Sequence, residues 1–219
     1  MFSEMLISKK IGSWFDPDTI RLEEHLLLGR GSKRLCFAFP GKPDLRVKVS
    51  RPDYHWQVGQ KQSFAEVSYL DYLARRDGKA PEIFPESLGW VNTGYGPGLV
   101  MEKVAGLEGF PSMSLRQLLE VGVITPEAAT AAMHELKAYV VGHGLVVSDW
   151  NVDNVIPSGN MDTLKPMIID GFGMKEPGVK NTIFTRIRYL ARYRSQRSWE
   201  RQCRKVEKSI LDPTVGKIR

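Results

Sequence analysis

The chain has 219 residues, enough for one sizeable core or two small lobes but too few for two domains of ordinary size. Hydrophobic residues make up 42% of the sequence and charged residues 26%, ordinary globular values that exclude wholesale disorder. No run approaches the roughly 18 apolar residues of a membrane-spanning helix. Residues 1–10 include Glu4 and lack the long apolar stretch of a signal peptide, so we expect a cytoplasmic protein.

Charge is distributed unevenly along the chain. Residues 180–219 contain twelve Lys or Arg and three acidic residues, so this basic tail carries +9; the net charge is +6, which leaves −3 for the first 179 residues. A basic segment can bind nucleic acid, anionic lipid or an acidic partner, and a solvated helix face is the simpler alternative. The two cysteines, Cys36 and Cys203, are far apart in sequence, and we expect reduced thiols.

The front half of the chain predicts a small strand-rich lobe. Residues 20–49 contain short strands separated by glycine and proline turn signals. Apolar residues at helical spacing predict a helix over residues 63–75. Two further strands are expected at residues 88–91 and 99–104.

The back half is predominantly helical. Thr125, Pro126 and Glu127 predict the N-cap and first turn of a long helix, whose buried stripe would include Met133 and which would end near Gly142. The other expected elements are a short helix at 115–121, extended runs at 144–147 and 167–169, and helices from 181 onward. We therefore predict an α+β protein of two lobes, residues 1–104 and 105–219.

Several residues of the front lobe have the types and order with which protein kinases hold ATP. Glycines between two predicted strands let backbone N–H groups approach a phosphate, and such a loop is expected at Gly29, Arg30, Gly31 and Ser32. Lys48 lies on a predicted strand and Glu66 on the following helix, as in the kinase ion pair that holds the α- and β-phosphates. A tight hairpin and the solvent face of a strand are the simpler alternatives. By position, backbone groups of the linker residues Met101, Glu102 and Val104 would hold adenine.

The strongest motif is the segment from Asp149 to Asn154, which has the D-x-x-x-x-N spacing of a kinase catalytic loop and follows a predicted helix and an apolar run. Asp170 comes sixteen residues later, between an apolar strand and Gly171, where kinases place a metal-binding aspartate. Mg²⁺ prefers hard oxygen ligands, so we predict that Asn154 and Asp170 hold it. Asp149 would accept the proton of the attacking hydroxyl or orient that hydroxyl. Ordinary loop chemistry is the simpler alternative, but the order of all these motifs favours a kinase-like fold.

Beyond the kinase motifs, the chain resembles the YrbL family, small kinase-like bacterial proteins linked to the PhoP regulatory network. The resemblance extends over residues 24–207 and is carried by four segments, residues 28–36, 46–49, 66–70 and 194–204. It implies a minimal bilobal protein-kinase-like fold with a truncated helical C-lobe, in the bacterial cytosol, and it implies no particular substrate.

The sequence also departs from the protein-kinase pattern. Arg34 stands in place of the third loop glycine, and Asn151 in place of the lysine two residues after the catalytic aspartate. Asp-Gly-Phe-Gly replaces Asp-Phe-Gly at residue 170, and only 49 residues follow Asp170, with no Ala-Pro-Glu motif. The usual platform for docking a peptide is therefore mostly missing.

Three functions stay open at this point. The first is an ATP- and Mg²⁺-dependent kinase that moves the γ-phosphoryl group of ATP to a hydroxyl of a protein or small molecule, with Lys48, Glu66 and Asp149 as catalytic residues. The second is a nucleotide-binding pseudokinase or regulatory module. The third is a binder of nucleic acid or anionic lipid through the basic tail. Delivery out of the cell as an effector is a further open possibility.

Overall fold

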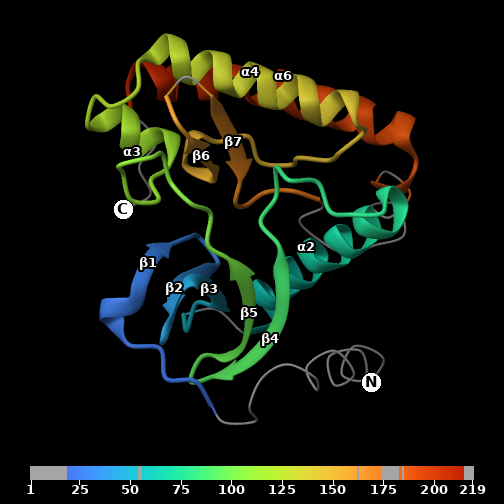
Figure 1. The fold of residues 1–219 in the computed structure, drawn as a ribbon. Coiled ribbons are helices and arrows are strands. Elements are labelled where there is room, and N and C mark those ends of the chain that lie inside the picture. The colour runs from blue at the N-terminus through green and yellow to red at the C-terminus, as the bar shows by residue number, and fades with distance from the viewer. Residues whose placement is uncertain (1–18, 54–55, 162, 174–182, 184, 215–219) are drawn as a thin grey trace. The chain divides into compact units, whose positions relative to one another are not determined.

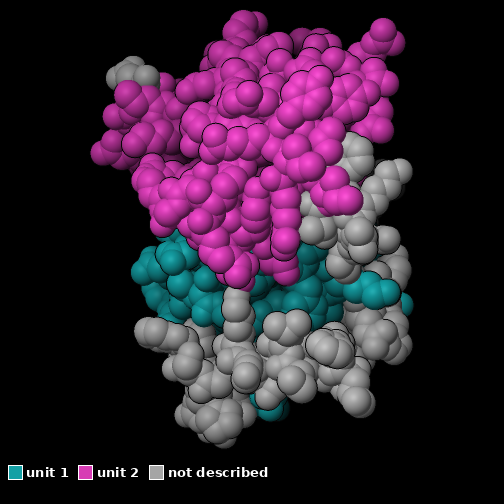
Figure 2. All heavy atoms as spheres, turned by 90° about the vertical axis from the view of Figure 1, so that its right-hand side faces the viewer, with its two compact units in different colours: residues 1–67, 86–103 teal, residues 68–85, 104–219 magenta. Residues whose placement is uncertain are grey.

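The computed structural model of the protein describes residues 19–53, 56–161, 163–173, 183 and 185–214 (Figure 1). The chain divides into two compact units, which Figure 2 shows in teal and magenta. Unit 1 comprises residues 1–67 and 86–103, and unit 2 comprises residues 68–85 and 104–219. No helix in the described part of the chain is long and apolar enough to cross a membrane.

Unit 1 is built on a five-stranded antiparallel sheet with the order β1-β2-β3-β5-β4. Its strands are Leu27–Arg30 (β1), Arg34–Phe39 (β2), Lys42–Ser50 (β3), Ser87–Thr93 (β4) and Gly96–Glu102 (β5). A short 3₁₀ turn, Glu24–Leu26 (η1), precedes β1. The core of the sheet includes the buried side chains of Phe37, Val47 and Val100. The strands predicted in this part of the chain are confirmed, with the first beginning at Leu27.

Helix α2 runs from Trp56 to Asp77 and begins earlier than the predicted start at residue 63. Gly59 lies in its first turns, and glycine is a poor helix former, by about 1 kcal/mol relative to alanine. A side chain at this position would collide with the hydroxyl of Ser50 at the end of β3. The glycine therefore permits close approach of the helix to the strand, a tertiary reason that the sequence pattern does not contain.

Unit 2 contains the helices α3 (Leu115–Glu120), α4 (Pro126–Gly142) and α6 (Arg188–Leu211) and the hairpin β6 (Val155–Gly159) and β7 (Leu164–Ile168). Helices α4 and α6 lie side by side (Figure 1), and the rings of His134 and Trp199 meet edge to face at 5.5 Å. The predicted N-cap of α4 is confirmed, because Oγ1 of Thr125 accepts the N–H of Ala128 at 3.2 Å. The predicted buried stripe is confirmed too, at Ala129, Met133, Leu136 and Val140.

Unit 2 differs from the sequence analysis at strand β6 and at residues 144–147. The sequence analysis did not predict strand β6, because Pro157 and Gly159 are typical of loops. Strand β6 pairs only with β7 in the described sheet, and proline, which has no N–H to donate, is tolerated in a strand where its nitrogen faces away from the partner. The extended run 144–147 is no strand, and only Val147 forms an isolated bridge, to Phe172. Helix α6 begins at Arg188, and Ile187 at its N-cap is exposed. Phe184, an apolar residue at helical spacing from Ile187 in the sequence, lies outside the described residues.

Both cysteines, Cys36 and Cys203, are free thiols, as expected.

Candidate active site

Lys48 and Glu66, the predicted ion pair of the front lobe, meet in unit 1. Lys48 lies on β3 between two valines, yet it is only 6% exposed, so the simpler alternative of a solvent-facing lysine is wrong. Its Nζ lies 3.4 Å from Oε2 of Glu66, a residue of α2 that is 1% exposed. A strand lysine paired with a helix glutamate, within this order of strands and helix, is the arrangement of the protein-kinase fold. The α+β class with a kinase-like fold is confirmed.

Arg34 is a second cation on the same carboxylate, and the sequence did not predict this role. The first residue of β2, it donates from Nη2 to Oε1 of Glu66 at 2.6 Å and from Nη1 to Oε2 at 2.9 Å. Nη1 also donates to the hydroxyl of Ser63 at 3.2 Å. A bidentate guanidinium at these distances is a stronger partner for the carboxylate than an ammonium at 3.4 Å. The sequence signal for this ion pair was an arginine at the first position of an otherwise apolar strand.

The predicted phosphate loop is the tight turn from β1 into β2. The N–H of Gly31 donates to the carbonyl of Arg34 at 2.8 Å, so the turn itself uses this donor. A Cβ at Gly31 would lie 3.2 Å from that same oxygen, which leaves little room for a side chain. Arg51, just after β3, holds the loop in place, since its N–H donates to the carbonyl of Lys33 at 3.1 Å. The loop residues Gly29, Arg30, Gly31 and Ser32 are all exposed.

The predicted adenine-contacting residues lie at the end of β5 and just beyond it. The side chain of Met101 is fully buried. The N–H of Glu102 donates to the carbonyl of Glu86 at 2.9 Å, and its carbonyl accepts Nε of Arg46 at 2.9 Å. Both backbone groups of Glu102 are therefore engaged within unit 1. Val104, the third of these residues, is buried and belongs to unit 2.

In unit 2 the backbone around Asp149 is tied to the glycine that follows Asp170. The N–H groups of Ser148 and Asp149 both donate to the carbonyl of Gly171, at 2.7 and 3.2 Å. Gly171 has a φ of +78°, and a Cβ there would lie 2.6 Å from the Cβ of Asp149. Glycine is required at this position for both reasons. These bonds bring the two predicted motifs together.

Asn154 completes this cluster. It ends the 3₁₀ turn Val152–Asn154 (η2), its carbonyl accepts the N–H of Ile169 at 2.8 Å, and its Nδ2 donates to the carbonyl of Asp149 at 3.4 Å. Asn151 caps the same turn, because its Oδ1 accepts the N–H of Asp153 at 3.3 Å. Asn151, which stands in place of the kinase lysine, therefore stabilises this turn.

The donor set of this cluster fits a magnesium ion. Oδ1 of Asp170 accepts the N–H of Gly171 at 2.6 Å, which fixes the carboxylate beside the glycine turn. Asn154 must direct its NH₂ at the Asp149 carbonyl, since a carbonyl oxygen only accepts, and this leaves the amide oxygen as the end suited to a cation. A carboxylate and an amide oxygen are hard ligands of the kind that Mg²⁺ prefers. Mg²⁺ usually keeps several waters and binds substrate phosphates, so phosphate and water oxygens would complete the coordination.

Aromatic side chains pack against this cluster and hydrogen-bond to the backbone next to it. Phe172, next to Gly171, is 1% exposed and packs on Phe84 with ring centroids 4.6 Å apart. The hydroxyl of Tyr69, on α2, accepts the N–H of Val146 at 2.7 Å, and burial raises the pKa of Tyr69. The hydroxyl of Tyr69 thus anchors the backbone that leads to Asp149, and Phe172 of the Asp-Gly-Phe-Gly motif is fixed by its packing on Phe84.

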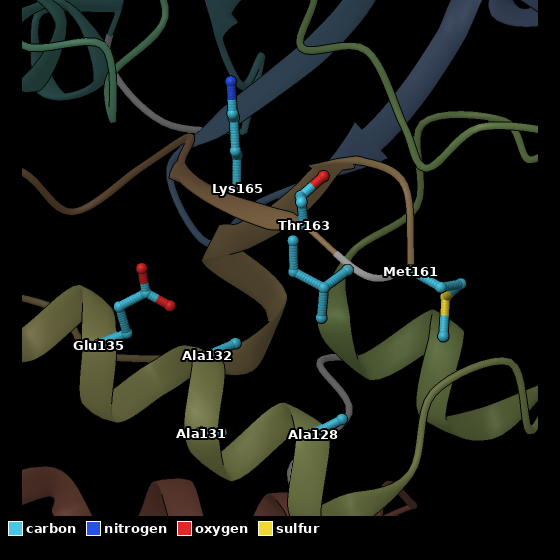
Figure 3. Close-up of a pocket in the computed structure, with 8 residues that line it drawn as sticks. Ala128, Ala131, Ala132, Glu135, Met161, Thr163 and Lys165 are labelled. Carbon is cyan, nitrogen blue, oxygen red and sulfur yellow. The ribbon is translucent and has the colours of Figure 1, made fainter.

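A separate open pocket of about 500 Å³ lies between α4 and the β6–β7 hairpin (Figure 3). The pocket exists because the α4 residues on this side, Ala128 and Ala132, are small. Across the pocket from them lie Met161 and Thr163 of the hairpin turn. Glu135 and Lys165 stand at its edge. None of the predicted site residues lines it.

Comparisons with known proteins give the following similarities. The family profile described as PhoP regulatory network protein YrbL matches residues 20–207. YrbL of Escherichia coli strain K12 and YrbL of Shigella flexneri are each 28% identical to the chain over 158 residues, which cover 70% of this chain and 73% of the relative. A solved co-crystal structure of WbdD with the kinase inhibitor LY294002 has a TM-score of 0.45 and 14% identity. That match covers 78% of this chain and 44% of the WbdD chain, less than half its length.

Proposed function

The chain belongs to the family described as PhoP regulatory network protein YrbL, and from this membership and the candidate site we propose that it is an ATP- and Mg²⁺-dependent phosphotransferase. It would move the γ-phosphoryl group of ATP to a hydroxyl of a protein or small molecule. The observation that carries the proposal is the hydrogen-bonded cluster in unit 2, in which the backbone of Asp149 is linked to Asn154 and to Gly171, the residue after Asp170.

Each predicted residue has a part in this reaction. We assign the phosphates of ATP to Lys48, oriented by Glu66, and to the loop of Gly29, Arg30, Gly31 and Ser32. Because the N–H of Gly31 is already used by the turn, the donors beside it carry this contact. Adenine is assigned to the linker of Met101, Glu102 and Val104, where Val104 has the leading role because both backbone groups of Glu102 are engaged.

The chemical step needs a base near the acceptor and neutralisation of phosphate charge. Asn154 and Asp170 would hold Mg²⁺, which when bound neutralises charge on the β- and γ-phosphates. Asp149 accepts the proton of the acceptor hydroxyl as the new O–P bond forms and the bond between the γ-phosphorus and the bridging oxygen breaks, releasing ADP. A bacterial cytoplasmic location stays a prediction.

Calorimetric titration with ATP, with and without Mg²⁺, tests binding, and hydrolysis of γ-labelled ATP, in which water takes the place of the acceptor hydroxyl, tests turnover. The natural chain should bind ATP in a Mg²⁺-dependent way and turn it over. Asp170→Ala should lose the Mg²⁺-dependent binding, whereas Asp149→Ala should keep binding and lose turnover. Glu108→Gln removes a negative charge from an exposed site in the same unit and should change neither. Binding by the natural chain without turnover would instead favour the pseudokinase alternative, and turnover retained by both Asp variants would contradict the proposal.

A second candidate function rests on the outer face of α6. Five exposed cations recur there at three- and four-residue spacing: Arg197, Arg201, Arg204, Lys205 and Lys208. Burial, and next the charge of Arg201, lower the pKa of the neighbouring Arg194. Like charges one turn apart destabilise a helix by about 0.2–0.5 kcal/mol per pair, so a bound polyanion would reduce the repulsion between these cations.

The helix favours nucleic acid over lipid as that polyanion. Between Arg197 and Lys208, the segment that carries the five cations, the large apolar side chains Trp199 and Val206 are buried in the fold; the exposed side chains of Tyr189, Tyr193 and Leu211 lie outside this segment. A helix that lies in a membrane surface would present such residues to the lipid. Arginine-rich faces suit phosphate, because the guanidinium group binds it in a bidentate way.

A further inference from the structure

The side-chain amide of Gln202, on the inner face of α6, joins the two residues that flank Asp149. Its Oε1 accepts the N–H of Trp150 at 3.2 Å, and its Nε2 donates to the carbonyl of Ser148 at 3.2 Å. The two residues on either side of the candidate catalytic aspartate are thereby held by one group, which comes from more than fifty residues further along the chain.

The orientation of this amide is determined by its partners. A backbone N–H can only donate and a carbonyl can only accept, so a flipped amide would lose both bonds. The second hydrogen of Nε2 is directed at Ser198, one turn earlier on α6, whose Oγ lies 2.9 Å away and whose side chain is buried. Ser198 therefore fixes the Gln202 amide in the orientation that bonds the loop.

Ser195, two turns before Gln202 on the same helix, extends this contact along the loop. Its Oγ accepts the N–H of Val147 at 3.3 Å and donates to the carbonyl of Leu145 at 2.7 Å. The run from Leu145 to Trp150 belongs to no strand, so its backbone groups need partners other than a β-ladder. Polar side chains of α6 supply several of them.

We propose that Gln202 is a positioning residue for Asp149. Fixing the peptide groups on both sides of Asp149 fixes its Cα–Cβ direction, and with it the place of the carboxylate that receives the acceptor proton. The catalytic consequence rests on the phosphotransfer function proposed above; the structural consequence, an ordered loop, does not. A displacement of about 1 Å at a reacting group costs roughly 100-fold in rate, which sets the size of the expected effect.

The test combines two readouts on Gln202→Ala, with Gln196→Ala as the matched control. Gln196 lies on the same helix but bonds only to Glu200 at the surface among the described contacts. Gln202→Ala should speed amide hydrogen exchange at Trp150, and it should lower kcat roughly 100-fold while the KM for ATP and the calorimetric affinity for Mg²⁺-ATP stay unchanged. Gln196→Ala should alter neither readout.

Gln202→Glu separates hydrogen bonding from packing, because its size is nearly unchanged. At pH 8 the carboxylate repels the carbonyl of Ser148, so the side chain should withdraw from the loop and the Trp150 amide should lose protection. At pH 5 a half-buried glutamate beside a carbonyl oxygen regains a proton, and protection should return, since burial raises the pKa of a carboxyl. This variant also serves if Gln202→Ala fails to fold.

Unchanged protection at Trp150 in both variants would overturn the proposal, and so would a fall in kcat accompanied by an equal loss of ATP affinity. If the natural chain shows no phosphotransfer but Gln202→Ala loses protection, the proposed function fails and the positioning of the loop stands.

Discussion

At the scale of single residues, the carboxylate of Glu66 is shared by Arg34 and Lys48 inside unit 1. Removing one partner of a buried ion pair leaves an uncompensated charge and typically costs about 3–5 kcal/mol. We expect Arg34→Ala to lower the free energy of unfolding by about 3 kcal/mol or more, and Arg34→Lys by less, because lysine keeps the charge but not the bidentate geometry. Urea unfolding followed by tryptophan fluorescence measures both.

Arg30→Ala is the matched control for Arg34, four residues away at the other end of the turn from β1 into β2. Arg30 pairs with Glu24 at 3.3 Å, and both side chains are largely exposed. Exposed pairs contribute at most about 1 kcal/mol. Equal losses for Arg30→Ala and Arg34→Ala would show that Arg34 is not the principal partner of Glu66.

Tyr69 provides a pH-dependent test at the same scale. Burial raises its pKa above the usual value of about 10, so the fold binds the phenol proton more tightly than the unfolded chain does. This contribution to stability is fully present below pH 10 and is lost as the pH rises above that value. The free energy of unfolding should therefore fall as the pH rises from 10 to 11 in the natural chain, and less steeply in Tyr69→Phe.

At neutral pH, Tyr69→Phe should itself cost about 1–3 kcal/mol, because the buried N–H of Val146 loses its acceptor. The control is Tyr189→Phe, at a site 76% exposed, which should affect neither neutral stability nor its pH dependence. A pH profile of Tyr69→Phe identical to that of the natural chain would contradict the assignment.

At the scale of elements, α6 has two different faces: the inner one holds the catalytic-loop backbone through Ser195 and Gln202, and the outer one is basic. If the outer face binds nucleic acid, log K for a single-stranded oligonucleotide should fall linearly with log salt concentration, by about 0.7 per phosphate contacted. The double variant Arg201→Gln, Lys205→Gln should reduce that slope by roughly one to two. Fluorescence anisotropy at several salt concentrations measures the slope.

The control for α6 removes the same charge elsewhere. Lys61 and Lys165 are exposed and lie on other elements, so Lys61→Gln, Lys165→Gln should leave the slope unchanged. A flat salt dependence in the natural chain would show that the basic face is only a solvated surface.

At the scale of the whole molecule, the candidate residues are divided between the units, with Lys48 and Glu66 in unit 1 and Asp149, Asn154 and Asp170 in unit 2. A ligand at 100 times its Kd stabilises a protein by about 2.7 kcal/mol. If residues of both units bind Mg²⁺-ATP, amide exchange should slow in β3 and in residues 145–173 together. Lys48→Ala should remove the protection from both segments, whereas Lys61→Ala should not. Protection confined to β3 would mean that unit 1 binds the nucleotide alone.

The sequence by itself determined most of the elements, the α+β class and the spacing of Asp149, Asn154 and Asp170, because apolar periodicity, caps and turn residues act over a few neighbouring positions. The early start of α2 depended on a contact between Gly59 and Ser50, and β6 on a partner strand that tolerates proline. The pairing of Arg34 with Glu66 spans 32 residues, and that of Gln202 with Ser148 spans 54. Only the tertiary structure decided which distant polar groups would meet, since any buried carboxylate or peptide group needs a partner but no local pattern specifies which one.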